Sequence, residues 1–368
     1  MKLLIPGPVT THRSVRAALT HDIAPWDPDF RAVYHGLRVR LLRLAGGQDG
    51  VHAALPLPGC GHFVTEAAIR SLIPSGGRLL VPLTGAYADR MIRLAREAGR
   101  DAVPLPIAAD QPTDPAAVRR ALLADPGLSH VGLVYSETGS GVVHDPAAIG
   151  AEARALGRQM IVDAVSAFGA LPLDLAAQPE ISAVVFTANK CLEGVPGSAF
   201  AIVRTDRLLT VGRAGSWSFD LADVAARLAG GDGARFTPAP QVLAALVVAL
   251  DRLDAEGGPP ARLARYRANM RALYNGMCGL GLTPLLPPAV QGPIVLNIDA
   301  PADPAWDLQA FVAAVKRRGF VISNFYNTPR PSFRLGCIGA LRPADMRRAV
   351  TAIGAALDEI GIRQRKAA

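Results

Sequence analysis

Short apolar runs alternate with amphipathic stretches over the first two thirds of this 368-residue chain. The runs predict strands at 79–83, 131–135, 161–163 and 184–186. The stretches 88–98 and 146–156 have the periodicity of helices, and Pro146 suits a first helical turn. Because strands alternate with helices, we expect an α/β fold with a mainly parallel sheet covered on both faces.

A further apolar run at 199–203 predicts another strand. Its connection from the strand at 184–186 is too short to hold a crossover helix, which favours an antiparallel strand.

The pattern changes after a long helical stretch at 240–255, which ends near a Gly/Pro-rich segment at 257–260. Beyond it we expect helices at 261–280, 306–318 and 343–360, and strands at 294–298, 320–323 and 333–336. This mixture predicts a small C-terminal α+β domain at 246–368, after a large domain at 16–245.

Composition supports a large buried core, because hydrophobic residues make up 50% of the chain and charged residues 19%. Mean hydropathy is +0.24, but no apolar run approaches the roughly 18 residues of a membrane-spanning helix. The apolar start of the chain is too brief for a signal peptide. We therefore expect a cytoplasmic protein with no membrane partner.

The formal net charge is +8 and the pI about 9.7. The basic residues are mostly arginines scattered through helical stretches, and the one dense cluster, 363–366, is interpreted as a solvated tail, so nucleic acid is not an expected partner. The four cysteines form no CxxC pair. Neither a metal site nor a disulfide framework is indicated.

Lys190 is the most informative residue, because it stands alone between the end of an apolar strand and a Gly/Pro-rich loop. Upstream, Asp163 ends another apolar strand. A lysine amine can bind an aldehyde cofactor covalently, and a carboxylate can hold the pyridinium nitrogen of such a cofactor. The alternative is a surface lysine and an aspartate that caps a helix.

Four other segments follow strands or interrupt them. The turn at 59–62 reads Gly-Cys-Gly-His before a helical run, which offers free backbone N–H groups to an anion or forms an ordinary turn. Tyr87 could stack on a flat cofactor or pack in the core. The hydroxyl-rich segment 136–141 could bind a ligand or simply turn. Arg334 lies inside an apolar strand, so it needs an anionic partner, either structural or a substrate acid group.

In this order the features resemble the fold-type I enzymes that use pyridoxal 5′-phosphate, in the branch of the alanine–glyoxylate and serine–pyruvate aminotransferases. Within that branch the chain resembles the 2-aminoethylphosphonate–pyruvate aminotransferase family over nearly its whole length. The matching motifs lie at 6–11, 26–30, 161–170, 188–197, 216–221, 235–237 and 333–339.

The resemblance implies a seven-stranded, mainly parallel sheet in the large domain and an N-terminal arm, 1–15, near the active site. It also implies a homodimer with its active sites at the subunit interface. The substrates would be a small amino donor and a keto acid. The expected reaction converts 2-aminoethylphosphonate and pyruvate to phosphonoacetaldehyde and alanine.

The resemblance also assigns roles residue by residue. Lys190 would carry the cofactor and act as general base, and Asp163 would pair with the pyridine nitrogen. Arg334, with Pro8, would bind the acid group of the substrate. The remaining cofactor contacts would come from Cys60, Gly61, His62, Tyr87, Thr138, Val165, Asn189 and, toward the neighbouring subunit's cofactor, Thr237.

Three segments depart from the family. The turn at 59–62 normally reads Gly-Ser-Gly-Thr, the strand end at 137–141 normally carries one more hydroxyl, and 324–330 replaces a Pro-Gly-Lys segment just before Arg334. These changes affect the expected identity of the substrate, whereas the cofactor chemistry should survive them. The alternatives are therefore an aminotransferase acting on another small donor, such as alanine or serine with glyoxylate, a pyridoxal phosphate lyase, and a non-catalytic relative that binds cofactor or ligand.

Overall fold

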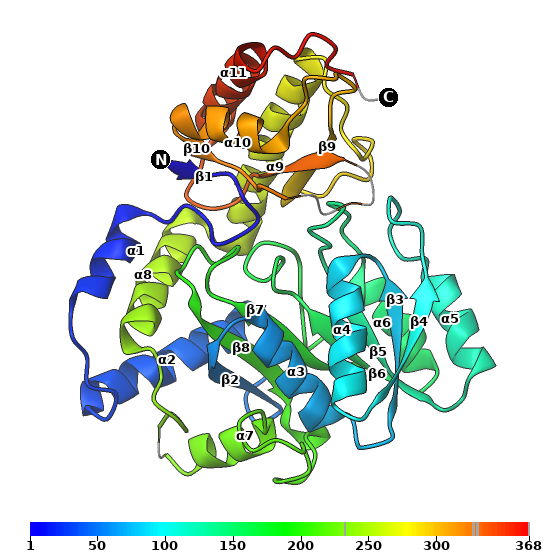
Figure 1. Ribbon diagram of the computed structural model, residues 1–368. Helices are drawn as coiled ribbons and strands as arrows, with labels where there is room; N and C mark the ends of the chain where they lie inside the picture. The colour runs from blue at the N-terminus through cyan, green and yellow to red at the C-terminus, as the bar shows by residue number, and fades with distance from the viewer. Residues whose placement is uncertain (232, 326–327, 329–330, 367–368) are drawn as a thin grey trace.

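The computed structural model describes residues 1–231, 233–325, 328 and 331–366 (Figure 1). Its centre is a seven-stranded sheet in the order β2-β8-β7-β6-β5-β3-β4. The strands are β2 (His52–Gly59), β3 (Arg78–Leu83), β4 (Asp101–Pro106), β5 (Leu128–Val134), β6 (Gln159–Asp163), β7 (Ile181–Thr187) and β8 (Gly197–Arg204).

The sheet is mainly parallel, as the sequence predicts. Strands β4, β3, β5, β6 and β7 pair in parallel, and β8 runs antiparallel to both β7 and β2. The antiparallel orientation expected for the strand after Lys190 is therefore confirmed. Since β2 is antiparallel to β8, it points the same way as the parallel strands.

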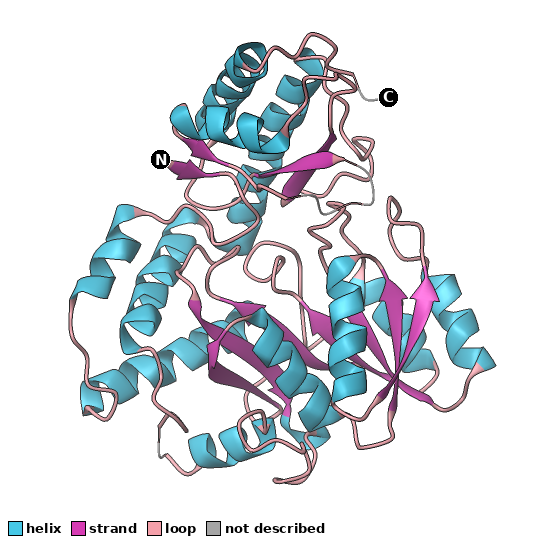
Figure 2. Cartoon of the chain, in the orientation of Figure 1, coloured by secondary structure: helices cyan, strands magenta, loops and turns pink. Residues whose placement is uncertain are grey.

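Helices cover both faces of this sheet (Figure 2). Along β7, Ala183 and Val185 pack into the cluster under α3 (Gly61–Leu72), α4 (Ala86–Glu97) and α7 (Leu221–Ala229). Val184 and Phe186 pack into the cluster on the opposite face, because successive side chains of a strand point to opposite faces. The helices there are α2 (Pro28–Leu44), α5 (Pro115–Ala124), α6 (Pro146–Ala155) and α8 (Pro240–Glu256).

The C-terminal elements have a core of their own and lie above the large sheet in Figure 1. Strands β9 and β11 pair antiparallel, while β10 pairs in parallel with β1, so the first residues of the chain join this region. The elements are β1 (Lys2–Leu3), α9 (Gly258–Gly279), β9 (Val295–Asp299), α10 (Leu308–Arg317), β10 (Phe320–Val321), β11 (Ser332–Gly336) and α11 (Pro343–Glu359). Helix α1 (Arg13–Ala17) lies beside α8 instead, and its Val15 packs into the core of the large sheet.

Several boundaries differ from the sequence expectation. The helix expected from residue 306 begins at Leu308, because the Asp307 carboxylate accepts the Ala310 N–H at 2.7 Å and caps it. The strand expected at 320–323 ends at Val321. Helix α8 continues through the expected domain boundary at 245/246.

Strands β2 and β4 have no counterpart in the sequence prediction. Both contain proline, Pro56 and Pro58 in β2 and Pro104 and Pro106 in β4. They are the two edge strands of the sheet, where a missing N–H can face away from the ladder. Among the described residues, no helix is long and apolar enough to cross a membrane.

Two leucines that differ in burial should contribute very differently to the stability of the fold. Leu133 in β5 is fully buried, whereas Leu123 in α5 is 56% exposed. We expect Leu133→Ala to lower the free energy of unfolding by about 2–5 kcal/mol and Leu123→Ala to change it by less than about 0.5 kcal/mol. Urea denaturation of both variants measures the difference. Equal losses would contradict this description of the core.

Candidate active site at the carboxyl edge of the sheet

The predicted site residues follow strands that end at one edge of the sheet. Asp163 is the last residue of β6, and Lys190 comes three residues after β7, its parallel neighbour. Thr138 follows β5, Tyr87 follows β3, and Cys60 directly follows β2. Because these strands point the same way, their ends bring residues distant in sequence to one edge, where open α/β sheets bind ligands.

Lys190 is half-buried against the N-terminal segment. Gly7 packs on it so closely that a Cβ at position 7 would lie 2.3 Å from the Lys190 Nζ. Burial, together with the charges of Arg334 and Arg90, lowers the pKa of the Lys190 amine to about 8, although Cys191 and Asp163 act in the opposite direction. The amine is therefore partly neutral, and so nucleophilic, near neutral pH.

The loop after Lys190 is anchored by helix α9. Arg262 donates from Nη1 to the Cys191 carbonyl at 2.8 Å. Glu193, with a positive φ of 60°, accepts at Oε1 from the Tyr266 hydroxyl and from Arg265 Nη2, both at 2.7 Å. This buried network holds the loop in place, and nothing in the local sequence around Lys190 indicates it.

Asp163 is buried beside this loop. Its Oδ1 accepts the Val165 N–H at 2.9 Å. Burial raises the pKa of the carboxyl to about 6, although the Val165 N–H and the charges of Arg90 and Lys190 stabilise the ionised form. A buried carboxylate in this position needs a cationic partner.

The turn before α3 has free backbone donors. Cys60 is the N-cap residue, and its side chain does not cap the helix. Gly61 leaves no room for a side chain, because a Cβ there would lie 2.7 Å from Cγ2 of Val165 and 3.5 Å from Cγ2 of Thr187. The buried Thr187 hydroxyl has no hydrogen-bond partner among the described residues. The N-terminus of α3 with this hydroxyl forms a place for an anion.

Thr187 is absent from the sequence prediction. It reads as one more residue of an apolar strand, and its unpaired hydroxyl emerges only in the structure. Arg90 is also absent from the prediction. Its guanidinium lies 4.8 Å from the centre of the half-buried Tyr87 ring and acts on the pKa of both Asp163 and Lys190.

Arg334 comes from β11 of the C-terminal region and is buried. It donates from Nη1 to the Thr138 carbonyl at 3.0 Å and from Nη2 to the Ser323 hydroxyl at 3.5 Å. Its guanidinium lies 5.2 Å from the ring centre of Phe325. Its Nε, also buried, has no hydrogen-bond partner among the described residues. One N–H of this guanidinium fork is therefore available to a ligand that accepts a hydrogen bond.

The other predicted residues are less constrained. Asn189 is half-buried next to Lys190, His62 is half-buried at the start of α3, and Pro8 and Thr237 are exposed. Thr237 is expected to reach a neighbouring subunit, so its role stays a prediction. Within the departing segment 324–330, residues 326–327 and 329–330 lie outside the described residues.

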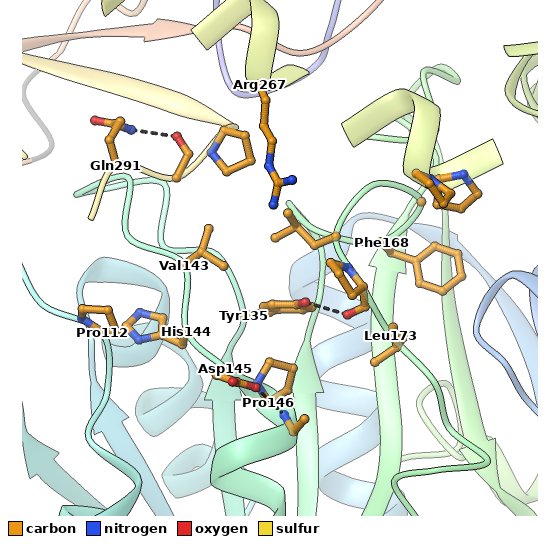
Figure 3. A pocket seen from close by; sticks show the side chains of 18 of the residues that line it. Pro112, Tyr135, Val143, His144, Asp145, Pro146, Phe168, Leu173, Arg267 and Gln291 are labelled. Atoms are coloured by element: carbon orange, nitrogen blue, oxygen red, sulfur yellow. Dashed lines mark hydrogen bonds between the residues drawn. The ribbon is translucent and has the colours of Figure 1, made fainter. Parts of the chain in front are cut away.

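A separate cavity of about 1200 Å³ lies between α9, the start of α6 and the segment 288–293. Figure 3 shows Tyr135, Phe168 and Arg267 around it. None of the predicted site residues lines this cavity. The predicted site residues therefore lie at the strand ends and not in this cavity.

Comparison with known proteins gives a consistent result. The family described as Aminotransferase class-V matches residues 58–218. The chain is 42% identical to a 2-aminoethylphosphonate–pyruvate transaminase of Cupriavidus necator, over 98% of this chain and 96% of that protein. It is 45% identical to one of Burkholderia pseudomallei, over 99% of this chain and 98% of that protein.

Solved structures agree on the fold. Pyridoxamine–pyruvate aminotransferase from Mesorhizobium loti superposes with a TM-score of 0.89 and 26% identity, over 99% of this chain and 93% of that one. Ureidoglycine–glyoxylate aminotransferase from Bacillus subtilis superposes with a TM-score of 0.87 and 21% identity, over 99% and 95%. The expected fold type is thus confirmed.

The surroundings of Lys190 predict unusual amine reactivity. Only neutral amines attack an amine-directed reagent. The rate at Lys190 should therefore rise with pH and level off above about 8, whereas an amine with the ordinary lysine pKa of 10.5 levels off two or more pH units higher. Peptide mass spectrometry of the cofactor-free protein measures this, with Lys2, Lys316 and Lys366 as internal comparisons. A Lys190 rate that still climbs steeply at pH 10 would contradict it.

Proposed function

The chain belongs to the class-V aminotransferases, in the family of 2-aminoethylphosphonate–pyruvate transaminases, and we propose that it moves the amino group of 2-aminoethylphosphonate to pyruvate. The products are phosphonoacetaldehyde and alanine. The observation that carries this proposal is the buried Arg334 fork, with its unpaired Nε, at the same strand edge as Lys190 and Asp163. It supplies an acid-binding group next to an amine of lowered pKa.

The proposed cofactor is pyridoxal 5′-phosphate, and the residues present fit it. Lys190 offers a reactive amine, and the α3 N-terminus with Thr187 offers an anion site for a phosphate. Asp163 offers a buried carboxyl that has no cationic hydrogen-bond partner in the part of the chain that the structure describes. When bound, this cofactor supplies an aldehyde to combine with amines and a ring that takes up electrons.

Each residue has a definite task in this scheme. Lys190 binds the cofactor through Nζ, gives way to the amino donor, and then moves a proton with its freed amine, a general-base role that its lowered pKa favours. Asp163 would stay ionised beside a protonated ring nitrogen, since that cation would compensate its burial. Tyr87 would stack on the ring, and Thr138, Val165 and Asn189 would supply further contacts to it.

The phosphate end belongs to the turn before α3 in this proposal. Cys60, Gly61 and His62 surround it, and the helix dipole favours an anion there. Because Gly61 has no room for a Cβ, the backbone itself can approach the ligand.

Arg334 explains why both substrates carry an acid group. The phosphonate of the donor and the carboxylate of pyruvate would bind the same guanidinium in turn, and Pro8 is proposed to contact the same acid group. A pairing of this kind is strong only where water is excluded, and Arg334 is 4% exposed. An amino donor without an acid group would gain no binding energy from the Arg334 guanidinium.

A spectroscopic experiment tests donor and cofactor together. We expect the purified protein loaded with pyridoxal phosphate to absorb in the visible range and to lose this band when 2-aminoethylphosphonate is added without keto acid. Pyruvate should restore the band with release of alanine. Lys190→Ala is the matched control, because it removes the amine that returns the cofactor to its starting form.

Other outcomes separate the alternatives. A band that ignores the phosphonate but responds to alanine or serine would replace the donor and keep the aminotransferase. Release of ammonia without a keto acid would favour a lyase. A protein that takes up no cofactor would contradict the scheme and favour a non-catalytic relative.

We also propose a homodimer with the active sites at its interface. Trp217 is 74% exposed and packs against Phe236, next to the exposed Thr237. Contiguous exposed apolar patches, rather than single side chains, mark interaction surfaces, and Trp217 with Phe236 supplies two adjoining rings. The four cysteines are free thiols, in keeping with the reducing cytoplasm that we propose as the location.

Sedimentation velocity tests the dimer. We expect the protein to sediment as a dimer, and Trp217→Asp to shift it toward monomer because the interface would bury a charge. Leu123→Asp, on an exposed helix far along the sheet, is the control and should remain dimeric. A monomeric starting protein would contradict the proposal.

A further inference from the structure

Glu137 is a buried carboxyl at the site that none of the roles above uses. It lies three residues after β5, between the ends of β3 and β6, and is fully buried. A buried, ionisable side chain is costly unless it is paired or neutral. Its position beside the predicted cofactor and acid-binding residues therefore calls for a reason.

The carboxyl group holds a tight turn. Its Oε1 accepts the Gly139 N–H at 2.8 Å, and the backbone closes the turn through the Gly141 N–H, which donates to the Glu137 carbonyl at 2.8 Å. The Glu137 side chain also packs closely against Gly85, the residue before α4. A Cβ at Gly85, whose φ is +150°, would lie 2.7 Å from the Glu137 Cδ.

The same turn is gripped from the C-terminal region. Arg334 donates to the Thr138 carbonyl at 3.0 Å, and Asn297 donates from Nδ2 to the next carbonyl, that of Gly139, at 2.9 Å. Arg334 and Asn297 are cross-strand partners in β11 and β9. The turn at Thr138 and Gly139 is therefore held by the Glu137 carboxyl on one side and by Arg334 and Asn297, from β11 and β9, on the other.

The charged and polar groups that face Glu137 come from each neighbouring element. Burial raises the pKa of its carboxyl to about 7. The N–H groups of Gly139 and Tyr87 and the charge of Arg334 lower it, and the charge of Asp163 raises it. Its charge therefore changes near neutral pH. Its buried Oε2 has no partner that meets the ordinary geometry of a hydrogen bond among the described residues.

We propose that Glu137 is a positioning residue for the substrate's acid group: through the Thr138–Gly139 turn it places the Arg334 fork, and through its charge it sets how strongly that fork binds an anion. This rests on the proposed function, in which Arg334 receives the acid group. The ligand chemistry is a small carboxylate or phosphonate.

The direction of the effect follows from charge. Neutral Glu137 holds the turn as an acceptor and leaves the guanidinium charge of Arg334 to the ligand. Ionised Glu137 attracts Arg334 and repels the incoming anion. The affinity for an acid group is therefore highest below the Glu137 pKa and falls as pH rises through about 7.

The test measures binding of propionate, an unreactive carboxylate, to the enzyme loaded with pyridoxal phosphate. Calorimetry at about pH 6 and about pH 8.5 should show binding roughly three- to tenfold weaker at the higher pH, the equivalent of about half to one pKa unit. Glu137→Gln keeps an acceptor without the charge, so most of this pH dependence should vanish while the affinity at the lower pH stays within about twofold.

Two further variants make the result decisive. Arg334→Gln should abolish propionate binding, which tests the acid site independently of Glu137. Glu152→Gln, on the surface of α6, should behave like the unmodified enzyme. Thermal unfolding of each variant shows whether it is folded.

The outcomes are distinguishable. Binding that depends on Arg334 but has the same pH profile in Glu137→Gln as in the unmodified enzyme would overturn the role of Glu137 and leave the proposed function standing. Propionate that does not bind the unmodified enzyme, or binds equally well to Arg334→Gln, would overturn both. If Glu137→Gln unfolds at too low a temperature to be assayed, propionate binding is measured for Glu137→Asp at the same two pH values. This variant keeps the charge but has a shorter side chain, so the proposal expects weaker binding than in the unmodified enzyme at both pH values, and unchanged binding would overturn it.

Discussion

The site depends on burying an amine and a carboxyl at the ends of two adjacent parallel strands. Each loses hydration there, so the pKa of Lys190 falls to about 8 and that of Asp163 rises to about 6. The antiparallel β8 is what makes this possible, because the chain must reverse directly after Lys190. A crossover helix in its place would carry the lysine away from the edge.

The large sheet alone does not complete the site. Helix α9 holds the loop after Lys190 through Arg262 and Tyr266, and the N-terminal segment lies on the lysine at Gly7. Arg334, the proposed acid-binding residue, comes from β11, which reaches the turn after β5. Three parts of the chain thus meet at the candidate site, and a substrate bound at Arg334, as we propose, would also act on the contact between them.

Much of this arrangement could be predicted from sequence, and the remainder could not for physical reasons. Lys190 and Asp163 stand out because each is a charged residue at or just beyond the end of an apolar strand. The edge strands with their prolines resemble loops when read locally. The role of Glu137 depends on residues that are distant in sequence, such as Arg334. Thr187 is of interest because its buried hydroxyl has no hydrogen-bond partner among the described residues. The position of Glu193 depends on its contacts with α9. Local patterns carry no information on such contacts.

The most direct test of the whole account is to locate the cofactor on the chain. The sequence contains four lysines, Lys2, Lys190, Lys316 and Lys366. Borohydride reduction of the protein loaded with pyridoxal phosphate, followed by peptide mass mapping, shows which of them carries the cofactor. The account predicts one adduct, on Lys190, that forms in the native protein and not after unfolding. An adduct spread over the exposed lysines, with Lys190 unmodified, would contradict it.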